Sequence, residues 1–123
     1  MELRACCSPS HFDRFLWPYY VQFAEKAIEI GKVPVLHLDQ NWDREISKLA
    51  DLPAKKCVLN PDGMTDLRRF REAVGDRMAI MGDVSSGLMA LGTPDGVYMY
   101  VRDLIRDVGP KGPIIAPGWR RPD

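Results

Sequence analysis

The chain has 123 residues, enough for one domain with a hydrophobic core and too few for two. Hydrophobic residues make up 46% of the sequence and charged residues 28%, the balance of a globular protein. Lysine plus arginine and aspartate plus glutamate each number 17, so the formal net charge is zero. A neutral chain carries no broad basic surface for nucleic acid or an anionic membrane, and we expect neither as a partner.

The cysteines favour a reducing compartment. Cys6, Cys7 and Cys57 are an odd number, and no CxxC pair occurs among them. The first residues, MELRACCSPS, lack the apolar core of a signal peptide. No apolar run approaches the ~20 residues that a membrane-spanning helix needs. These features predict a cytoplasmic protein.

The first half of the chain predicts two helices around one strand. Apolar residues recur at helical spacing over 12–28, where Pro18 restarts the helix and Gly31 ends it. Residues 33–39 form a β-rich run that ends in polar residues. Residues 42–52 again show a helical pattern, which stops before a proline.

The second half repeats the alternation of strand and helix. Strands are predicted at 56–60, 78–81 and 112–116. The helices between them have predicted N-caps at Thr65 or Asp66 and at Thr93, which is followed by Pro94. A turn at 85–87 follows the strand at 78–81.

This alternation predicts an α/β fold with parallel strands and right-handed crossovers. We expect four parallel strands in sequential order within a single domain, residues 1–123. Two architectures fit: a doubly wound open sheet, or a partial (β/α)₈ TIM barrel, whose full form needs eight strands and about 250 residues. The strand residues predicted to be buried are Val35, Leu36, Val58, Leu59, Ile80, Ile114 and Ile115.

Polar residues follow the predicted strands, where both architectures place function. They are His37, Asp39, Asn41, Asn60, Asp62, Asp83, Trp119, Arg120 and Arg121. His37 and Asp39 are two residues apart on a strand and face the same way, so they are candidates to relay a proton or share a metal. The simpler alternative is a histidine held by the aspartate without chemistry. Asp62 and Asp83 lie beside glycines, so either they bind substrate or they belong to ordinary turns.

The sequence resembles the uroporphyrinogen decarboxylase superfamily, which includes corrinoid-dependent methyltransferases. Three motifs in the same order carry the resemblance: PVLHLDQNWD at 34–43, DGMTD at 62–66, and MAIMGDV at 78–84 with LGTP at 91–94. The resemblance covers residues 8–118. It implies that the chain is the C-terminal half of a (β/α)₈ barrel, with about four of its strands.

The Asn-Trp form of the first motif looks closer to the methyltransferase side of the superfamily. On that side the resemblance implies a zinc ion bound by a His-x-Cys pair and a later cysteine, and a corrinoid cofactor that carries the methyl group. His37 matches the first ligand, but Asp39 and Trp119 stand at the two cysteine positions. A carboxylate can bind zinc and an indole cannot, so we expect His37 and Asp39 to bind zinc weakly or not at all.

Three functions remain open. The first is a corrinoid-type methyltransferase fragment or subunit with His37 and Asp39 as catalytic residues and Asn41, Asp62 and Asp83 binding substrate. The second is a decarboxylase acting on a tetrapyrrole, although the resemblance places that enzyme's aspartate and arginines in an N-terminal half. The third is a truncated barrel without catalysis that acts as a binding or assembly module. Expected partners are a small-molecule substrate or a corrinoid protein, together with a second copy of the chain or a complementary N-terminal half.

Overall fold

The computed structural model describes residues 8–115, which form one sheet of four strands in the order β1-β2-β3-β4. The strands are β1 (Val35–Leu38), β2 (Val58–Pro61), β3 (Ala79–Met81) and β4 (Ile114–Ile115). Each neighbouring pair is parallel. The predicted α/β fold with sequential parallel strands is therefore confirmed, and the open sheet matches part of a (β/α)₈ barrel.

Helical segments precede the first strand. They are α1 (Pro9–His11), the π-helical segment η1 (Phe12–Leu16) and α2 (Trp17–Glu29). The side chain of Ser8 caps α1 by accepting a hydrogen bond from the backbone N–H of His11 at 3.3 Å. Pro18 lies in the first turn of α2, and Gly31 follows its end with a φ of 74°. The predicted end of this helix is confirmed. The helix does not restart after a break at Pro18, because η1 joins α1 directly to α2.

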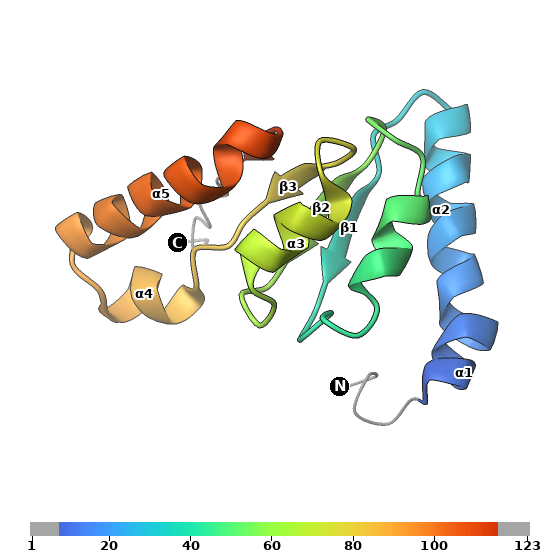
Figure 1. Ribbon diagram of the computed structural model, residues 1–123, viewed down its shortest axis with the longest axis horizontal. Coiled ribbons are helices and arrows are strands. Elements are labelled where there is room, and N and C mark those ends of the chain that lie inside the picture. Colours follow the sequence, from blue (N-terminus) through green and yellow to red (C-terminus); the bar gives the residue numbers. More distant parts are fainter. Residues whose placement is uncertain (1–7, 116–123) are drawn as a thin grey trace, which may run out of the picture.

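The longer helices of the second half begin at side-chain caps. Asp66 caps α3 (Leu67–Val74) by accepting a hydrogen bond from the backbone N–H of Arg68 at 2.8 Å. Thr93 caps α5 (Pro94–Val108), as predicted. In Figure 1, α2 stands beyond β1 at one end of the sheet, and α5 lies beyond β3 at the other end. No helix within residues 8–115 has both the length and the apolar composition of a bilayer-spanning segment.

Two short helices complete the second half of the chain. The predicted turn at 85–87 instead begins α4 (Ser86–Leu91), because the hydroxyl of Ser85 accepts a hydrogen bond from the backbone N–H of Leu88 at 3.1 Å. The 3₁₀ helix η3 (Gly109–Lys111) connects α5 to β4.

The prediction of a helix over 42–52 is wrong for residues 42–45 and for the type of helix that follows them. Only the 3₁₀ helix η2 (Ile46–Asp51) forms there. The backbone N–H of Trp42 donates to the hydroxyl of Thr65 at 2.7 Å, and its indole N–H donates to the carbonyl of Asp39 at 2.9 Å. One of these hydrogen bonds is long-range and the other is local, and together they hold the start of the segment in a non-helical conformation.

One face of the sheet packs against the helices. The register aligns Leu36 with Leu59 and Leu59 with Ile80, and all three side chains are buried. They join a core that includes Phe70 of α3 and Val108 of α5. The predicted burial of these strand residues is confirmed, as is that of Val58 on the opposite face.

The opposite face of the sheet, which we call the helix-free face, has less cover. Val35 is 47% exposed, so its predicted burial is wrong. Side chains alternate between the two faces of a strand, and the β1 pattern of exposed and buried residues follows this alternation. Ile114 is partly buried, and the side chain of Ile115 lies outside the described part of the chain. In a closed barrel, the helix-free face would be the interior.

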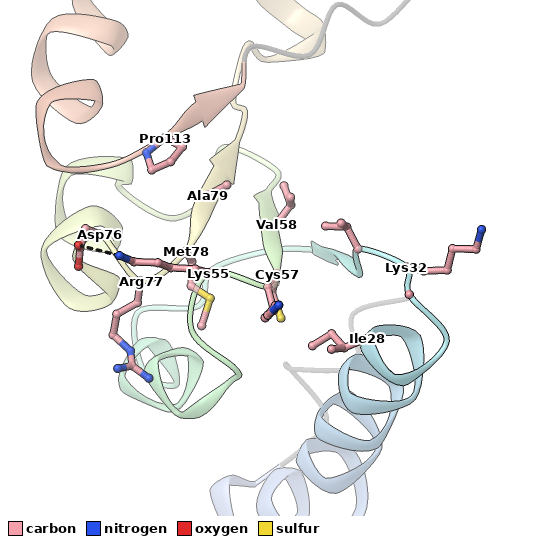
Figure 2. A pocket seen from close by; sticks show the side chains of 13 residues that line it. Ile28, Lys32, Lys55, Cys57, Val58, Asp76, Arg77, Met78, Ala79 and Pro113 are labelled. Atoms are coloured by element: carbon pink, nitrogen blue, oxygen red, sulfur yellow. Dashed lines mark ion pairs between the residues drawn. The ribbon is translucent and has the colours of Figure 1, made fainter.

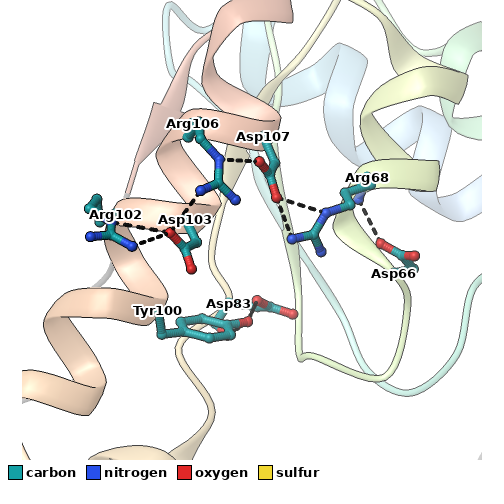
Figure 3. Close-up of polar contacts among 8 residues, drawn as sticks. All are labelled: Asp66, Arg68, Asp83, Tyr100, Arg102, Asp103, Arg106 and Asp107. Carbon is teal, nitrogen blue, oxygen red and sulfur yellow. Dashed lines mark hydrogen bonds and ion pairs between the residues drawn. The ribbon is translucent and has the colours of Figure 1, made fainter.

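An ion-pair cluster joins α5 to α3 (Figure 3). Arg68 of α3 donates to Asp107 of α5, with 3.0 Å between Nε and the carboxylate. Arg106 donates to the same carboxylate at 2.8 Å. The hydrogen bonds from Arg106 and Arg68 lower the pKa of Asp107 from 3.8 to about 2.

This low pKa predicts an acid-dependent contribution to stability. A carboxyl group with a lowered pKa stabilises the fold above its unfolded pKa of 3.8, and this stabilisation is lost as the pH falls to about 2. We expect Asp107→Asn to destabilise the protein at neutral pH, with a difference from the wild type that shrinks over that window. Urea unfolding at several pH values measures this difference. A difference that stays constant down to pH 2 would contradict the assignment. Arg68→Gln removes one of the two arginines that donate to Asp107, so it should also reduce the pH dependence of the free energy of unfolding.

Candidate functional site

A histidine lies between two polar partners at the carboxyl ends of β1 and β2. The sheet register pairs His37 with Asn60. Nδ1 of His37 lies 2.8 Å from Oδ1 of Asn60, and Nε2 lies 2.9 Å from a carboxylate oxygen of Asp39. The predicted contact between His37 and Asp39 is therefore present, and the structure adds Asn60 as a second partner.

The orientation of the Asn60 amide defines the role of each ring nitrogen. Its Nδ2 donates to the carbonyl of Met81 at 2.6 Å, so its Oδ1 faces His37 and accepts a hydrogen bond from Nδ1. With Nδ1 as a donor, the contact of 2.9 Å between Nε2 and the Asp39 carboxylate is a hydrogen bond only when Nε2 also carries a proton. The side chain of His37 is 50% exposed and that of Asp39 is 77% exposed, so a ligand can reach both.

Asn41 and Asp62 connect the loops that follow β1 and β2. The amide of Asn41 donates to the carbonyl of Met64 at 3.0 Å. The carboxylate of Asp62 accepts hydrogen bonds from the backbone N–H groups of Gln40 at 2.8 Å and Met64 at 3.2 Å. These contacts hold the two loops together beside His37, and the predicted binding of substrate by Asn41 and Asp62 stays a prediction.

Asp83 has a partner that the sequence did not indicate. The hydroxyl of Tyr100, on α5, donates to the Asp83 carboxylate at 2.6 Å and lies 3.1 Å from its carbonyl oxygen (Figure 3). The preceding residue, Gly82, has a φ of 134°, and a Cβ there would lie 3.1 Å from the carbonyl of Pro61. Only glycine suits this close approach, which places Asp83 next to the loop after β2.

Burial and neighbouring charges both change the pKa of the Asp83 carboxyl group. Burial raises the pKa of its carboxyl group, and the negative charges of Asp62 and Asp66 raise it further. The hydrogen bond from Tyr100 acts in the opposite direction. The sequence of α5 does not indicate this contact, because it depends on how the helix packs beside the residues that follow β3.

The described residues do not fit a zinc site. Within residues 8–115, no three His, Cys, Asp or Glu side chains come together as a possible metal site. His37 and Asp39 supply two donors, whereas zinc in proteins takes at least three protein ligands. Trp119 lies outside the described residues. Cys57 is buried at the start of β2, and burial raises the pKa of its thiol, which disfavours the thiolate that metals bind.

Comparison with known proteins identifies the family. Residues 4–120 match the family model described as Uroporphyrinogen decarboxylase (URO-D). No curated protein matches the chain. The family match spans nearly the whole sequence and agrees with the sheet of sequential parallel strands. The chain belongs to the uroporphyrinogen decarboxylase family.

Proposed function

We propose that the chain forms the C-terminal half of a family barrel that acts on a small substrate by methyltransferase-type chemistry. The observation that carries the proposal is the position of His37 between Asn60 and Asp39. Enzymes with (β/α)₈ barrels have their active sites at this end of the strands. A corrinoid supplies the methyl group when bound, carried by a partner protein, and the residues of this chain act on the methyl acceptor.

His37 is suited to take a proton from the acceptor. Asn60 holds Nδ1 as a donor, so the lone pair of a neutral imidazole lies on Nε2. A carboxylate cannot hydrogen-bond to this lone pair, so the exposed Asp39 side chain turns away before an acceptor thiol or hydroxyl donates to Nε2. The acceptor then transfers its proton to Nε2 as it becomes the nucleophile. The exposed Asp39 then stabilises the imidazolium through the contact at 2.9 Å. In this scheme His37 is the base, and Asn60 and Asp39 position it.

The charge around the site favours this chemistry over decarboxylation of a tetrapyrrole. Asp62, Asp66 and Asp83 lie close enough to interact electrostatically, and both arginines at the start of α3 are already paired with carboxylates. A substrate with several carboxylates needs unpaired cations at its binding site. A neutral methyl acceptor is not repelled by the carboxylates of these three aspartates.

A methyl-transfer assay tests the proposal. The assay mixes the protein with methylcobalamin and 2-mercaptoethanol and follows the loss of methylcobalamin absorbance. We expect His37→Ala to lower the rate by about 100-fold, the usual contribution of a general base. Asn60→Leu should lower it and change its pH profile, because Nδ1 loses its acceptor. Asn60→Asp retains an acceptor and should recover part of the rate.

The controls separate the remaining alternatives. We expect a chelator to leave the rate unchanged, and one tightly held zinc per chain that is lost on His37→Ala would contradict the two-ligand site. Tight, His37-dependent binding of uroporphyrin would favour the tetrapyrrole alternative. A folded protein with neither activity nor uroporphyrin binding would overturn the catalytic proposal and leave a binding or assembly module.

A further inference from the structure

Basic and acidic residues are segregated along the strands of the sheet. Each of the first three strands follows a basic residue and is itself followed by an aspartate. These residues are Lys32 and Asp39 around β1, Lys55, Lys56 and Asp62 around β2, and Arg77 and Asp83 around β3. Because the strands are parallel, the cations gather at the amino ends and the aspartates at the carboxyl ends, where His37 lies. The chain as a whole is neutral, so this separation of charge belongs to the fold.

The cations at the amino ends do not offset the charge at the carboxyl ends. Figure 2 shows Lys32, Lys55 and Arg77 spread around the amino ends of the strands. A strand rises about 3.3 Å per residue, so Lys32 lies up to about 20 Å from Asp39. At physiological ionic strength, salt screens exposed charges over ~8 Å. The aspartates therefore act on a ligand at the His37 site without compensation from these cations.

The carboxyl ends of β1 and β2 bring two carboxylates beside His37. The Asp62 carboxylate accepts a hydrogen bond at 2.8 Å from the backbone N–H of Gln40, the residue after Asp39. Arg68 and Arg69 of α3 each already pair with another carboxylate. Within residues 8–115, the surroundings of the site therefore favour a cationic ligand over an anionic one.

The Asp39 carboxylate is the group that an incoming cation can reach. Its side chain is 77% exposed, and one carboxylate oxygen lies 2.9 Å from Nε2 of His37. Within the described residues, this carboxylate has no other polar partner. An acceptor that donates to Nε2 takes the place of Asp39 there and leaves the carboxylate unpaired. An ammonium group a few bonds from the donating thiol can then pair with it, because the two groups on the protein are neighbours.

We propose that the site selects a small aminothiol as the methyl acceptor, with its thiol on Nε2 of His37 and its ammonium group on Asp39. This inference rests on the proposed function and adds the chemical class of the acceptor. The proton of the thiol still passes to Nε2. A carboxylate accepts hydrogen bonds at both oxygens, so Asp39 can hold the ammonium group and also contact the imidazolium that forms. A thiol that carries a carboxylate instead is repelled by Asp39 and Asp62.

Titration of the full chain without methylcobalamin, followed by the ring NMR signals of His37, tests this selection. The probes are 2-aminoethanethiol, 2-mercaptoethanol and 3-mercaptopropionate, which are similar in length and are cationic, neutral and anionic. We expect the cationic thiol to bind about fivefold more tightly than the neutral one, the upper end for an exposed ion pair, and the anionic thiol to bind most weakly. The preference should fall as salt is raised. Arg120 and Arg121 lie outside the described residues, and the full chain includes their charge in the measurement.

Matched variants assign the preference to Asp39. Asp39→Asn removes its charge and should reduce the preference for the cationic thiol to less than about twofold. Asp76→Asn removes the same charge from a residue that is 73% exposed near the amino ends of the strands, and it should leave the preference unchanged. Equal affinity for the three thiols, or a preference that persists in Asp39→Asn, would overturn the inference. Preferential binding of 2-aminoethanethiol without methyl transfer to any thiol would confirm the cationic preference and overturn the methyltransferase proposal.

Discussion

Replacing Arg71 by alanine is expected to lower the free energy of unfolding by about 3 kcal/mol or more, because buried carbonyl groups lose their donors. The Arg71 side chain is 1% exposed and donates to the carbonyls of Gly75 and Met78 at 2.9 Å and of Pro113 at 2.6 Å. These bonds join the end of α3 to the segments that lead into β3 and β4. Burial lowers the pKa of the guanidinium, which reflects the cost of desolvating its charge.

Urea unfolding at a fixed protein concentration measures the effect of Arg71→Ala. Arg69→Ala is the matched control, because Arg69 lies on the same helix, is 63% exposed and pairs with Asp43 at 3.3 Å. Loss of that surface pair should cost at most about 1 kcal/mol. Gly112→Ala probes the same contact from the other side, since its Cβ would lie 2.5 Å from Nη1 of Arg71. If Arg71→Ala destabilises no more than Arg69→Ala, the buried guanidinium does not hold these segments together.

Much of the fold was predictable because its signals are local. Hydrophobic periodicity and the caps at Asp66 and Thr93 depend on nearby residues, and they placed the strands, α3 and α5 correctly. The helix predicted over 42–52 does not form at its start, because the backbone N–H of Trp42 bonds to Thr65, a residue that the sequence pattern does not connect to it. The predicted burial of Val35 was wrong because the apolar character of a strand residue does not show whether its face of the sheet is covered.

The candidate site was predictable only in part, because only the contact between His37 and Asp39 joins residues that are close in the sequence. The spacing of His37 and Asp39 placed both side chains on one face of a strand, and their contact at 2.9 Å follows from that spacing. Asn60 was recognised as a polar residue after the next strand, but its bond to His37 depends on the register between β1 and β2. Tyr100 was missed because its contact with Asp83 requires the placement of α5 against the end of β3.

The chain is expected to associate with another half-barrel, because its sheet leaves apolar surface without cover. Beside the open edge of β1, Val33 is 65% exposed and Val35 is 47% exposed. Phe15, Tyr19 and Phe23 recur every four residues along η1 and α2 and are 51%, 68% and 55% exposed. At ~25 cal/mol per Å², covering several hundred Å² of such surface contributes several kcal/mol. That is comparable to the net stability of a small domain.

The geometry of barrel closure makes the same prediction. Four parallel strands cannot close into an eight-stranded barrel, so β1 and β4 are sheet edges within the described residues. Edge strands offer unpaired backbone groups to another chain. A second copy or a complementary N-terminal half would pair with these edges and cover the helix-free face. Completion of the barrel would also enclose the His37 site.

Sedimentation velocity at micromolar concentration tests most directly whether the chain is an open half of a barrel. The expected result is a dimer or larger assembly that dissociates as the protein is diluted. Phe23→Glu, which places a charge on the exposed apolar row of α2, should weaken the assembly, whereas Lys26→Gln on the same helix should not. A monodisperse monomer that unfolds cooperatively in urea would contradict the half-barrel account.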